Sequence, residues 1–353
     1  MKVLALTRYG RLGASSRVRM LQHVSWLDSA GVQVEVQPLI GDDMLRSRYE
    51  AGTYSRSAML GAYRGRLQCL GRRRRYDLLW IEKEALPWFP ASIERAWLQG
   101  VPYVLDYDDA LFHNYDLHRS KWVRRLLGRR IDRLMAGASL IVAGNEYLAK
   151  RARDAGARWV EILPTVVDLD RYPIGAVRHE GSVQRIVWIG SPSTAVYVQD
   201  LAEPLRRLAA RHAIKLRVIG AELAIPGVDV ECVPWTEDTE AESIAQCDIG
   251  IMPLKDSPWE RGKCGYKLIQ YMACGLPVVA SPVGVNVQIV REGENGFLAD
   301  GPQDWEIKMS QLLDSSPLRS SMGTAGRARV EQAYCVQEVA PRLAQMLIRA
   351  GAR

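Results

Sequence analysis

The stretch of residues 262–282 most restricts what this chain can fold into, because it reads as a loop, a helix and a buried strand in direct succession. Gly275 followed by Pro277 is the usual way for a helix to end. The apolar run Val278–Ala280 then suits a strand that is covered on both faces. The stretch therefore predicts one unit of a parallel α/β sheet.

The loop of this stretch also predicts an anion site. Lys263 and Lys267 stand four residues apart, so they share one face if the turn is already helical, and Gly265 between them keeps the loop free of bulk. Backbone N–H groups at a helix N-terminus, with two ammonium groups beside them, form a site for a phosphate or diphosphate. The alternative is a surface loop with two solvated lysines.

Length and composition predict two domains of an ordinary globular protein. The 353 residues exceed the size at which a single core stops growing, and 48% hydrophobic with 25% charged residues is typical of soluble proteins. No apolar run reaches membrane-spanning length, and the start Met1–Leu6 is too short for a signal peptide. The six cysteines lack metal-ligand spacing and fit a reducing cytosol. We expect a cytoplasmic protein.

The charge is uneven along the chain. Residues 1–172 hold 28 Lys and Arg against 19 Asp and Glu, a net charge of +9, whereas residues 173–353 hold 19 against 21, a net charge of −2. Clusters such as Arg72–Arg75 and Arg119–Arg133 favour an anionic partner, which could be lipid, an anionic acceptor or nucleic acid. For any single cluster the alternative is a solvated arginine-rich surface.

The N-terminus opens like a nucleotide-binding fold. A strand at Val3–Thr7 is followed by a loop of small residues and a helix over Arg17–Ala30. The loop does not match the dinucleotide fingerprint GxGxxG. Gly13 is predicted to let the backbone approach a ligand closely, and the alternative is a simple tight turn.

Polar residues follow two later strands of the first half. The strand that begins at Val101 ends in Asp106, Asp108 and Asp109, and Asn145 opens the helix after another strand. Ligands of open α/β sheets bind at the carboxyl ends of strands, where these residues fall. The DxD pattern can hold a divalent metal, but it arises often by chance, and one acid could cap the next helix. We predict a functional role for Asp108 or Asp109, and favour these two residues over Asp106.

The second half restarts the alternation of strands and helices at Arg185–Gly190. Ser191 is a candidate N-cap with Pro192 at the first helical position, so this turn predicts a second anion-binding nest. We place the domain boundary near residues 172–184, where Pro, Gly and polar residues gather.

Four segments in this order resemble the GT-B glycosyltransferases, specifically the retaining family 4, also called glycosyl transferases group 1. They are Pro164–Asp168, Ile186–Gly190, Tyr271–Ser281 and Gly293–Leu298. The resemblance implies an α/β fold with two Rossmann-like domains facing a cleft and a last helix that crosses back to the first domain. We therefore predict an acceptor-binding domain over 1–172, a nucleotide-sugar-binding domain over 173–335 and a crossing helix over 336–353.

The chain departs from the family pattern at the donor site. Two glutamates that flank the glycine loop in the family correspond here to Gly262 and Gln270, and the usual Arg and Lys near the start of the second domain are replaced by Ser191–Ala195. We expect Lys263 and Lys267 to supply the missing positive charge. The strand end where many members place a histidine corresponds to Asp108.

The resemblance implies transfer of a sugar from a nucleotide-diphosphate donor, of UDP or GDP type, to an acceptor hydroxyl with retention of anomeric configuration. Asp108 and Asp109 would orient sugar or acceptor hydroxyls, and no metal or other cofactor is expected. The predicted donor-binding residues are Gly13, Asn145, Ser191, Ser193, Thr194, Trp235, Lys263, Gly265, Tyr266, Lys267 and Gln270.

The predicted acceptor is a glycan or lipid-linked glycan in polysaccharide or glycolipid assembly, met by the basic first domain at the inner face of the membrane. Nucleic acid is not expected as a partner. Three alternatives stay open: a metal-dependent GT-A-like transferase, a sugar-nucleotide epimerase of GT-B architecture, and a non-catalytic basic protein that binds nucleic acid or membrane.

Overall fold

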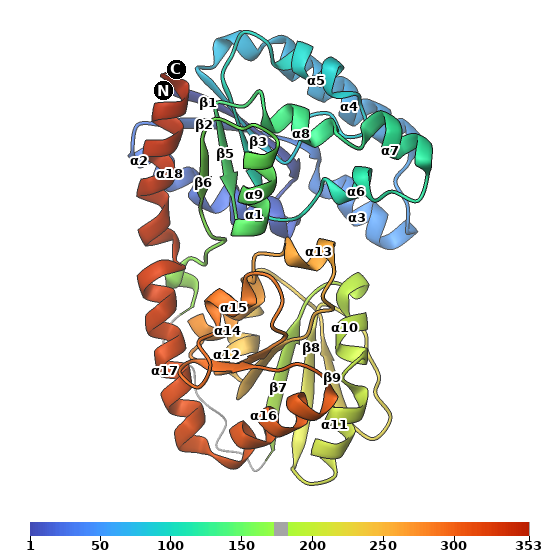
Figure 1. Cartoon of the computed structure of the whole chain (residues 1–353), viewed down its shortest axis with the longest axis vertical. Coiled ribbons are helices and arrows are strands. Elements are labelled where there is room, and N and C mark those ends of the chain that lie inside the picture. The colour runs from blue at the N-terminus through green and yellow to red at the C-terminus, as the bar shows by residue number, and fades with distance from the viewer. Residues whose placement is uncertain (173–182, 353) are drawn as a thin grey trace. The chain divides into compact units, whose positions relative to one another are not determined.

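The computed structural model describes residues 1–172 and 183–352, which form two compact units. The first unit comprises the described residues of Met1–Val166, Arg261–Cys264 and Val336–Arg353, and the second comprises those of Val167–Glu260 and Gly265–Cys335. Each unit is built around its own six-stranded sheet (Figure 1). The chain thus enters each unit more than once.

All strands of the first sheet pair in parallel, in the order β2-β1-β3-β4-β5-β6. They are β1 (Lys2–Tyr9), β2 (Gln33–Ile40), β3 (Leu78–Glu82), β4 (Tyr103–Tyr107), β5 (Leu140–Ala143) and β6 (Val160–Ile162). Alternate residues of a strand serve opposite faces. In β1, Leu4 and Leu6 enter one core, whereas Val3 and Ala5 enter another. Both faces are therefore apolar, and both need covering by helices.

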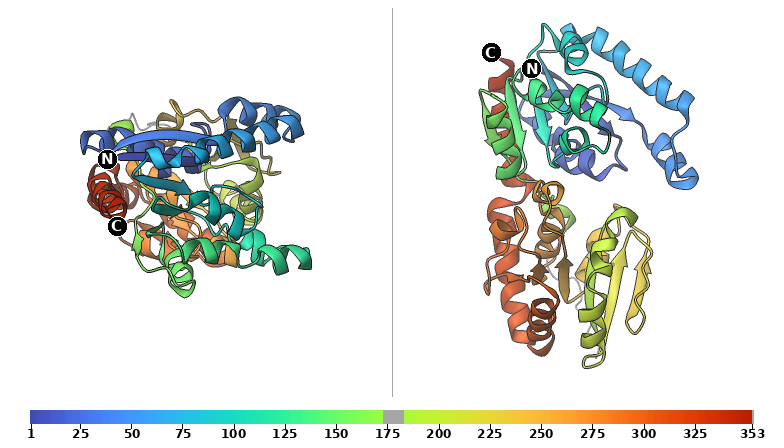
Figure 2. Two further views of the ribbon diagram at one scale, coloured as in Figure 1. Left: turned by 90° about the horizontal axis from the view of Figure 1, so that it is seen from above. Right: turned by 45° about the vertical axis from the view of Figure 1, so that its right-hand side comes forward.

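Helices cover both faces of the first sheet (Figure 2). One face packs against α4 (Arg56–Gly71), α5 (Ala91–Leu98), α8 (Arg130–Met135) and α9 (Glu146–Asp154), and the other packs against α2 (Val24–Ser29) and α18 (Val336–Gly351). The remaining helices are α1 (Ala14–Arg19), α3 (Asp42–Ala51), α6 (His113–Asp116), α7 (Lys121–Leu127) and the 3₁₀ turns η1 (Leu21–His23) and η2 (Arg73–Arg75).

The predicted single helix over Arg17–Ala30 is wrong in detail, because the segment divides into α1, η1 and α2. Met20 leaves the helical conformation, with φ −126° and ψ −57°, and its side chain is fully buried. The break therefore lets Met20 enter the core between two short helices.

The last helix belongs to the first unit, which confirms the crossing implied by the resemblance. Leu343 and Leu347 of α18 are fully buried in the same cluster as Val3 and Trp80 of the sheet. Figure 1 shows α18 beside α2, on the face that these residues share.

The second sheet is also wholly parallel, in the order β12-β11-β10-β7-β8-β9. Its strands are β7 (Gln184–Ile189), β8 (Ile214–Ile219), β9 (Asp229–Val233), β10 (Ile249–Met252), β11 (Val278–Ala280) and β12 (Gly296–Leu298). One face packs against α10 (Val196–Gln199), α11 (Ala202–Ala209) and α16 (Pro302–Asp314), and the other against α12 (Glu240–Ala245), α14 (Tyr266–Ala273) and α15 (Asn286–Ile289). Also present are η3 (Leu169–Arg171), η4 (Pro192–Thr194), α13 (Pro258–Arg261) and α17 (Ser316–Ala333). The predicted GT-B arrangement of two parallel α/β units is confirmed.

The stretch 262–282 folds as a loop, a helix and a strand, as predicted. Gly265 precedes α14 with φ +66°, and Gly275 follows it with φ +72°, a conformation that glycine adopts without strain. Lys263 lies before the helix, whereas Lys267 lies inside it. The turn at Lys263 is therefore not helical, and the condition under which both lysines would share one helical face is not met.

The predicted boundary after residue 172 differs from the observed division between Val166 and Val167. Val167 forms a parallel bridge with Cys335, and Tyr172 is buried in a core of the second unit. These contacts assign the segment to the second unit. Most of the predicted linker, 173–182, lies outside the described residues.

The packing of α18 predicts unequal effects of two neighbouring substitutions. Leu347→Ala should lower the free energy of unfolding by about 2–5 kcal/mol, because it leaves a cavity under a fully buried side chain. Ile348→Ala, next along the helix and 44% exposed, should change it by less than about 0.5 kcal/mol. Urea unfolding of both variants measures the difference, and equal effects would contradict the packing of α18 on the sheet.

Candidate active site

The carboxyl ends of parallel strands meet at one edge of a sheet, which is where α/β proteins bind their ligands. In the first unit this edge carries Glu82 at the end of β3 and Asp108 and Asp109 just after β4. Ser15, in the first turn of α1 after β1, contacts Asp108, because its Oγ donates to Asp108 Oδ2 at 2.5 Å. The edge therefore assembles a polar cluster from three strands.

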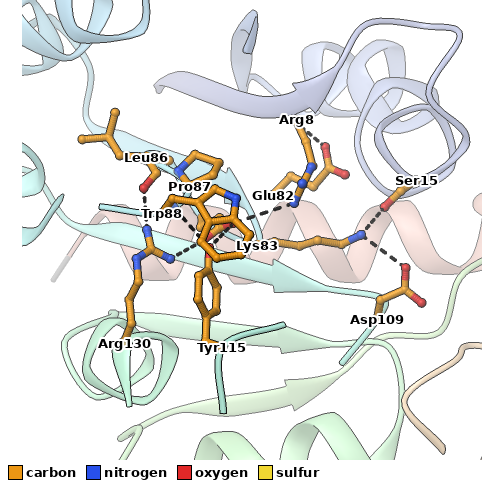
Figure 3. A network of polar contacts seen from close by, with 12 residues as sticks. Arg8, Ser15, Glu82, Lys83, Leu86, Pro87, Trp88, Asp109, Tyr115 and Arg130 are labelled. Atoms are coloured by element: carbon orange, nitrogen blue, oxygen red, sulfur yellow. Dashed lines mark hydrogen bonds and ion pairs between the residues drawn. The ribbon is translucent and has the colours of Figure 1, made fainter. Parts of the chain in front are cut away.

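Lys83 is the centre of this cluster (Figure 3). Its Nζ lies 2.8 Å from Asp108 Oδ1 and 3.4 Å from Asp109 Oδ2, and it donates to Ser15 Oγ at 3.0 Å. The Lys83 side chain is only 7% exposed, so one buried ammonium group compensates two carboxylates. Such an arrangement fixes both acids in position.

The two acids differ electrostatically. Burial raises the pKa of Asp108, but the Lys83 ammonium and the Ser15 hydrogen bond outweigh burial and hold that pKa below its ordinary value. Burial, reinforced by the neighbouring charge of Asp108, raises the pKa of Asp109 above its ordinary value despite Lys83. Adjacent carboxyl groups whose pKa values are pushed apart are typical of active sites.

Lys263 reaches the same cluster, with Nζ 4.0 Å from Asp109 Oδ1. Asn145 holds the loop that carries it, since its Nδ2 donates to the carbonyl oxygens of Gly262 at 3.0 Å and Lys263 at 2.9 Å. The Oδ1 of Asn145 accepts the Leu148 N–H at 3.0 Å and caps α9. Both ends of this predicted donor-binding amide make internal hydrogen bonds, so the structure gives Asn145 the role of positioning Lys263.

Two other predicted positions have structural roles. Asp106 points away from the pair and accepts from Arg19 Nε at 2.8 Å in the interior, where burial raises its pKa to about 6. At Gly13 a Cβ atom would lie 2.2 Å from the Cβ of Tyr9, so the turn after β1 has room only for glycine. The tight-turn reading of Gly13 accounts for this contact.

The segment between β3 and α5 contains two strained residues that the sequence did not reveal. Lys83 and Trp88 have φ of +63° and +66°, and they are the two non-glycine residues with positive φ in the described part of the chain. Each such conformation costs about 1–3 kcal/mol and persists only where its surroundings enforce it. The charged triplet Glu82-Lys83-Glu84 at the end of a buried strand is visible in the sequence and marks this segment as unusual. The residues that pair with the triplet come from distant segments, so the sequence does not show them.

In the second unit the predicted hydroxyl turn and Lys267 come together around Trp188. Lys267 Nζ lies 4.8 Å from the centre of the buried Trp188 ring. A Cβ atom at Gly190 would lie 2.6 Å from two carbons of that ring and 2.9 Å from Thr194 Oγ1. Lys267 and the turn after β7 therefore flank the same ring at the carboxyl edge of the sheet.

The turn after β7 presents three exposed or half-buried hydroxyls close together. Ser191 Oγ lies 3.0 Å from Ser193 Oγ and 3.4 Å from Thr194 Oγ1. Ser191 was predicted to cap a helix, but its side chain makes no capping hydrogen bond to η4. These hydroxyls, with the Lys267 ammonium, provide the donors that a phosphate group requires.

Two further predicted donor residues join an internal network. Trp235 Nε1 donates to Glu240 Oε2 at 2.7 Å, and Gln270 Nε2 donates to Tyr172 Oη at 3.0 Å. Tyr172 in turn donates to Glu240 Oε1 at 3.2 Å. Gln270 is only 2% exposed, so its amide makes its hydrogen bond inside the core. Tyr266, in contrast, is half-buried and is the first residue of α14, next to Lys267.

No group of three or more His, Cys, Asp and Glu side chains is placed to hold a metal ion within residues 1–172 and 183–352. The acids of the DxD pattern already have cationic partners, Arg19 for Asp106 and Lys83 for Asp108. This donor set does not fit a divalent cation.

Comparison with known proteins finds one similar family and several similar structures. Residues 183–315 match the protein family described as Glycosyl transferases group 1. This part of the chain is therefore similar to the group 1 glycosyltransferases. A D-inositol 3-phosphate glycosyltransferase of Thermobispora bispora is 30% identical over 130 residues, which are 36% of this chain and 29% of that protein. The chain thus spans less than a third of the length of this relative.

Solved structures share the fold over nearly the whole chain. The Anabaena protein Alr3699/HepE in complex with UDP superposes with a TM-score of 0.72 at 16% identity, over 99% of this chain and 100% of that one. WaaG, a glycosyltransferase involved in lipopolysaccharide biosynthesis, gives a TM-score of 0.71 at 15% identity, over 98% and 99% of the two chains. These likenesses establish the GT-B fold for both units.

The acid cluster makes a prediction for Lys83. Lys83→Met should lower the free energy of unfolding by about 3–5 kcal/mol, because it leaves buried Asp108 without its cation and Asp109 with only the more distant Lys263. The double variant Lys83→Met/Asp108→Asn should lose less than the two single variants together. Urea unfolding of the three variants tests the pairing, and additive losses would contradict it.

A second prediction concerns pH. Burial, with the nearby Arg19 charge, lowers the pKa of His23 to about 3, so between pH 6.5 and 3 only the unfolded chain binds this proton. Stability should therefore fall by about 1.4 kcal/mol per pH unit below pH 6.5. His23→Gln should remove this part of the pH dependence, as urea unfolding at pH 7 and pH 5 would show. His212→Gln, in the second unit, is the control that should retain it.

Proposed function

We propose that this protein is a retaining glycosyltransferase that moves a sugar from a nucleotide-diphosphate donor to an acceptor hydroxyl. The observation that carries the proposal is the grouping of Lys267 with the hydroxyl turn Ser191–Thr194 around Trp188, inside the group 1 domain. An ammonium group and several hydroxyls at a strand edge are suited to a diphosphate.

The role of the donor site follows from the charge that develops on the leaving diphosphate. As the glycosidic bond breaks, the leaving diphosphate gains negative charge, and fixed donors aimed at it lower the barrier. Lys267 is held in place by its contact with the Trp188 ring, and the Ser191–Thr194 hydroxyls are held by one another. These groups need no rearrangement to receive the developing charge.

The acceptor half is assigned to the first unit. Asp108, whose pKa lies below its ordinary value, is an ionised and fixed hydrogen-bond acceptor for hydroxyl groups. Asp109 lies nearer to solvent, with its side chain 31% exposed, and would contact the acceptor or the sugar. In the front-face route of retaining transferases the leaving phosphate takes the acceptor proton, so neither acid needs to act as a base.

The donor and acceptor classes rest on similar proteins. HepE was solved with UDP and with UDP-glucose, and WaaG takes part in lipopolysaccharide biosynthesis. We propose a UDP- or GDP-sugar as donor and a glycan or lipid-linked glycan as acceptor.

A membrane surface is the proposed location of the acceptor. In α7, Trp122 and Leu126 are 62% and 70% exposed beside the basic residues Lys121 and Arg125. Exposed apolar side chains next to basic ones suit an anionic lipid surface. No helix among residues 1–172 and 183–352 has both the length and the apolar character to cross a bilayer. We propose peripheral attachment at the cytoplasmic face.

The donor site makes the prediction that tests this function. Lys267→Ala should weaken binding of UDP-sugar or GDP-sugar by about tenfold or more and cut transfer, because a charged hydrogen-bond donor to the diphosphate is lost. Thermal shift and calorimetry on the full chain measure the effect, and Lys255→Ala, an exposed lysine of the same unit, is the matched control.

Other results would redirect the assignment. Unchanged donor affinity and turnover in Lys267→Ala would overturn the role of Lys267. Conversion of the donor without any acceptor would indicate an epimerase, and loss of activity with EDTA would indicate a metal-dependent transferase. No thermal shift with any sugar nucleotide, together with salt-sensitive binding to nucleic acid or lipid, would overturn the enzymatic function.

A further inference from the structure

Trp88 combines two features that rarely occur together. Its backbone has φ +66°, a conformation that a bulky side chain adopts only under constraint, and its side chain is 50% exposed. Glycine or asparagine would occupy this position with less strain. Since half of the indole contributes nothing to the core, the packing of the chain alone does not account for tryptophan here.

A buried network holds Trp88 from behind (Figure 3). Its backbone N–H donates to Tyr115 Oη at 3.2 Å, and Tyr115 Oη donates to Glu84 Oε2 at 2.8 Å. Glu84 also pairs with Arg130, which is 1% exposed and forms a second ion pair with Glu94. Breaking any of these contacts would leave a buried charge or polar group unpaired, so the network enforces the strained backbone.

Rings fix the indole as well as its backbone. Tyr115 meets the Trp88 ring edge-on at 5.1 Å, and His118 meets it edge-on at 5.9 Å. The Nδ1 of His118 accepts the Ser120 N–H at 3.0 Å, so the proton of the neutral imidazole is on Nε2. An exposed, immobile aromatic face thus has a hydrogen-bond donor at its border.

We propose that Trp88 is a stacking platform for a sugar ring of the acceptor, a glycan subsite that rests on the proposed transferase function. A pyranose ring offers an apolar C–H face that packs on an aromatic ring and a border of hydroxyls that need polar partners. Trp88 supplies the aromatic ring for the C–H face, and His118 supplies a polar partner for the hydroxyls. The backbone strain at Trp88 is explained if a ligand binds to the exposed face of the ring.

The position of Trp88 in the chain links this subsite to the acid cluster. The same connection between β3 and α5 carries both strained residues, Lys83 and Trp88. Lys83 points inward to Asp108 and Asp109, whereas the indole of Trp88 is exposed to solvent. One rigid segment therefore sets the spacing between the acids and the platform, as a site that selects an acceptor of several sugar units requires.

The test uses the full-length protein with three variants. Trp88→Gly removes the ring and relieves the strain, Trp88→Phe keeps a smaller ring, and Trp26→Ala removes another partly exposed tryptophan of the first unit, 37% exposed, as the control. Each protein is applied to an array of immobilised bacterial-type oligosaccharides, and its unfolding temperature and UDP-sugar thermal shift are measured in parallel.

Trp88→Gly should lose about tenfold or more of the glycan affinity, with an unfolding temperature equal to or above that of the wild type. Trp88→Phe should retain part of the affinity, and Trp26→Ala all of it. The UDP-sugar thermal shift should be unchanged in every variant, so failure of the donor site and failure of the platform give different results.

Three outcomes would overturn the platform. One is a wild-type protein that binds no glycan on the array, and another is a Trp88→Gly variant that binds as well as the wild type. The third is Trp88-dependent binding to phosphatidylglycerol vesicles with none to glycans, which would make the indole a membrane anchor. If the variant of the second outcome also has a lower unfolding temperature, Trp88 has a purely structural role.

Discussion

Parallel strand pairing is the constraint on which the rest of this structure depends. Because every strand of a sheet runs in one direction, all loops that follow the strands meet at one edge, and polar residues far apart in sequence become neighbours. Ser15, Lys83 and Asp108 follow three different strands of the first sheet, yet their side chains contact one another directly. The second sheet brings Lys267 and the turn after β7 to the same Trp188 ring in the same way.

In the first unit, charged side chains form ion pairs with one another near this edge of the sheet. Lys83 faces Asp108 and Asp109, Arg19 faces Asp106, and Arg130 faces Glu84 and Glu94. Pairs of this kind contribute little net stability, because desolvation opposes attraction, but removing one partner is costly. Their value lies in fixed geometry, and the two strained residues after β3 are held by the same pairs.

The sequence predicted the fold well because the fold depends on local patterns. Apolar runs such as Val278–Ala280, with glycines at helix ends, identify strands and helix boundaries without knowledge of their neighbours. The acids after β4 were also predictable, since position at a strand end is visible in sequence. Lys83 and Trp88 were not, because the partners that hold them come from distant segments: Asp108 and Asp109 for Lys83, and Tyr115 for Trp88. Asn145 and Gln270 were expected to face a ligand, but no local signal shows that an amide is satisfied internally.

The division of the chain between the units has a consequence for synthesis on the ribosome. One face of the first sheet is covered by α18, which is formed by the last described residues of the chain. Residues 261–264, which carry Lys263 to the acid cluster, are also made long after β1 to β6. The first unit cannot complete its core until residues 336–351 have been made, and one apolar face of its sheet stays uncovered meanwhile. Folding of this protein is therefore expected to depend on protection of the nascent first sheet until α18 emerges.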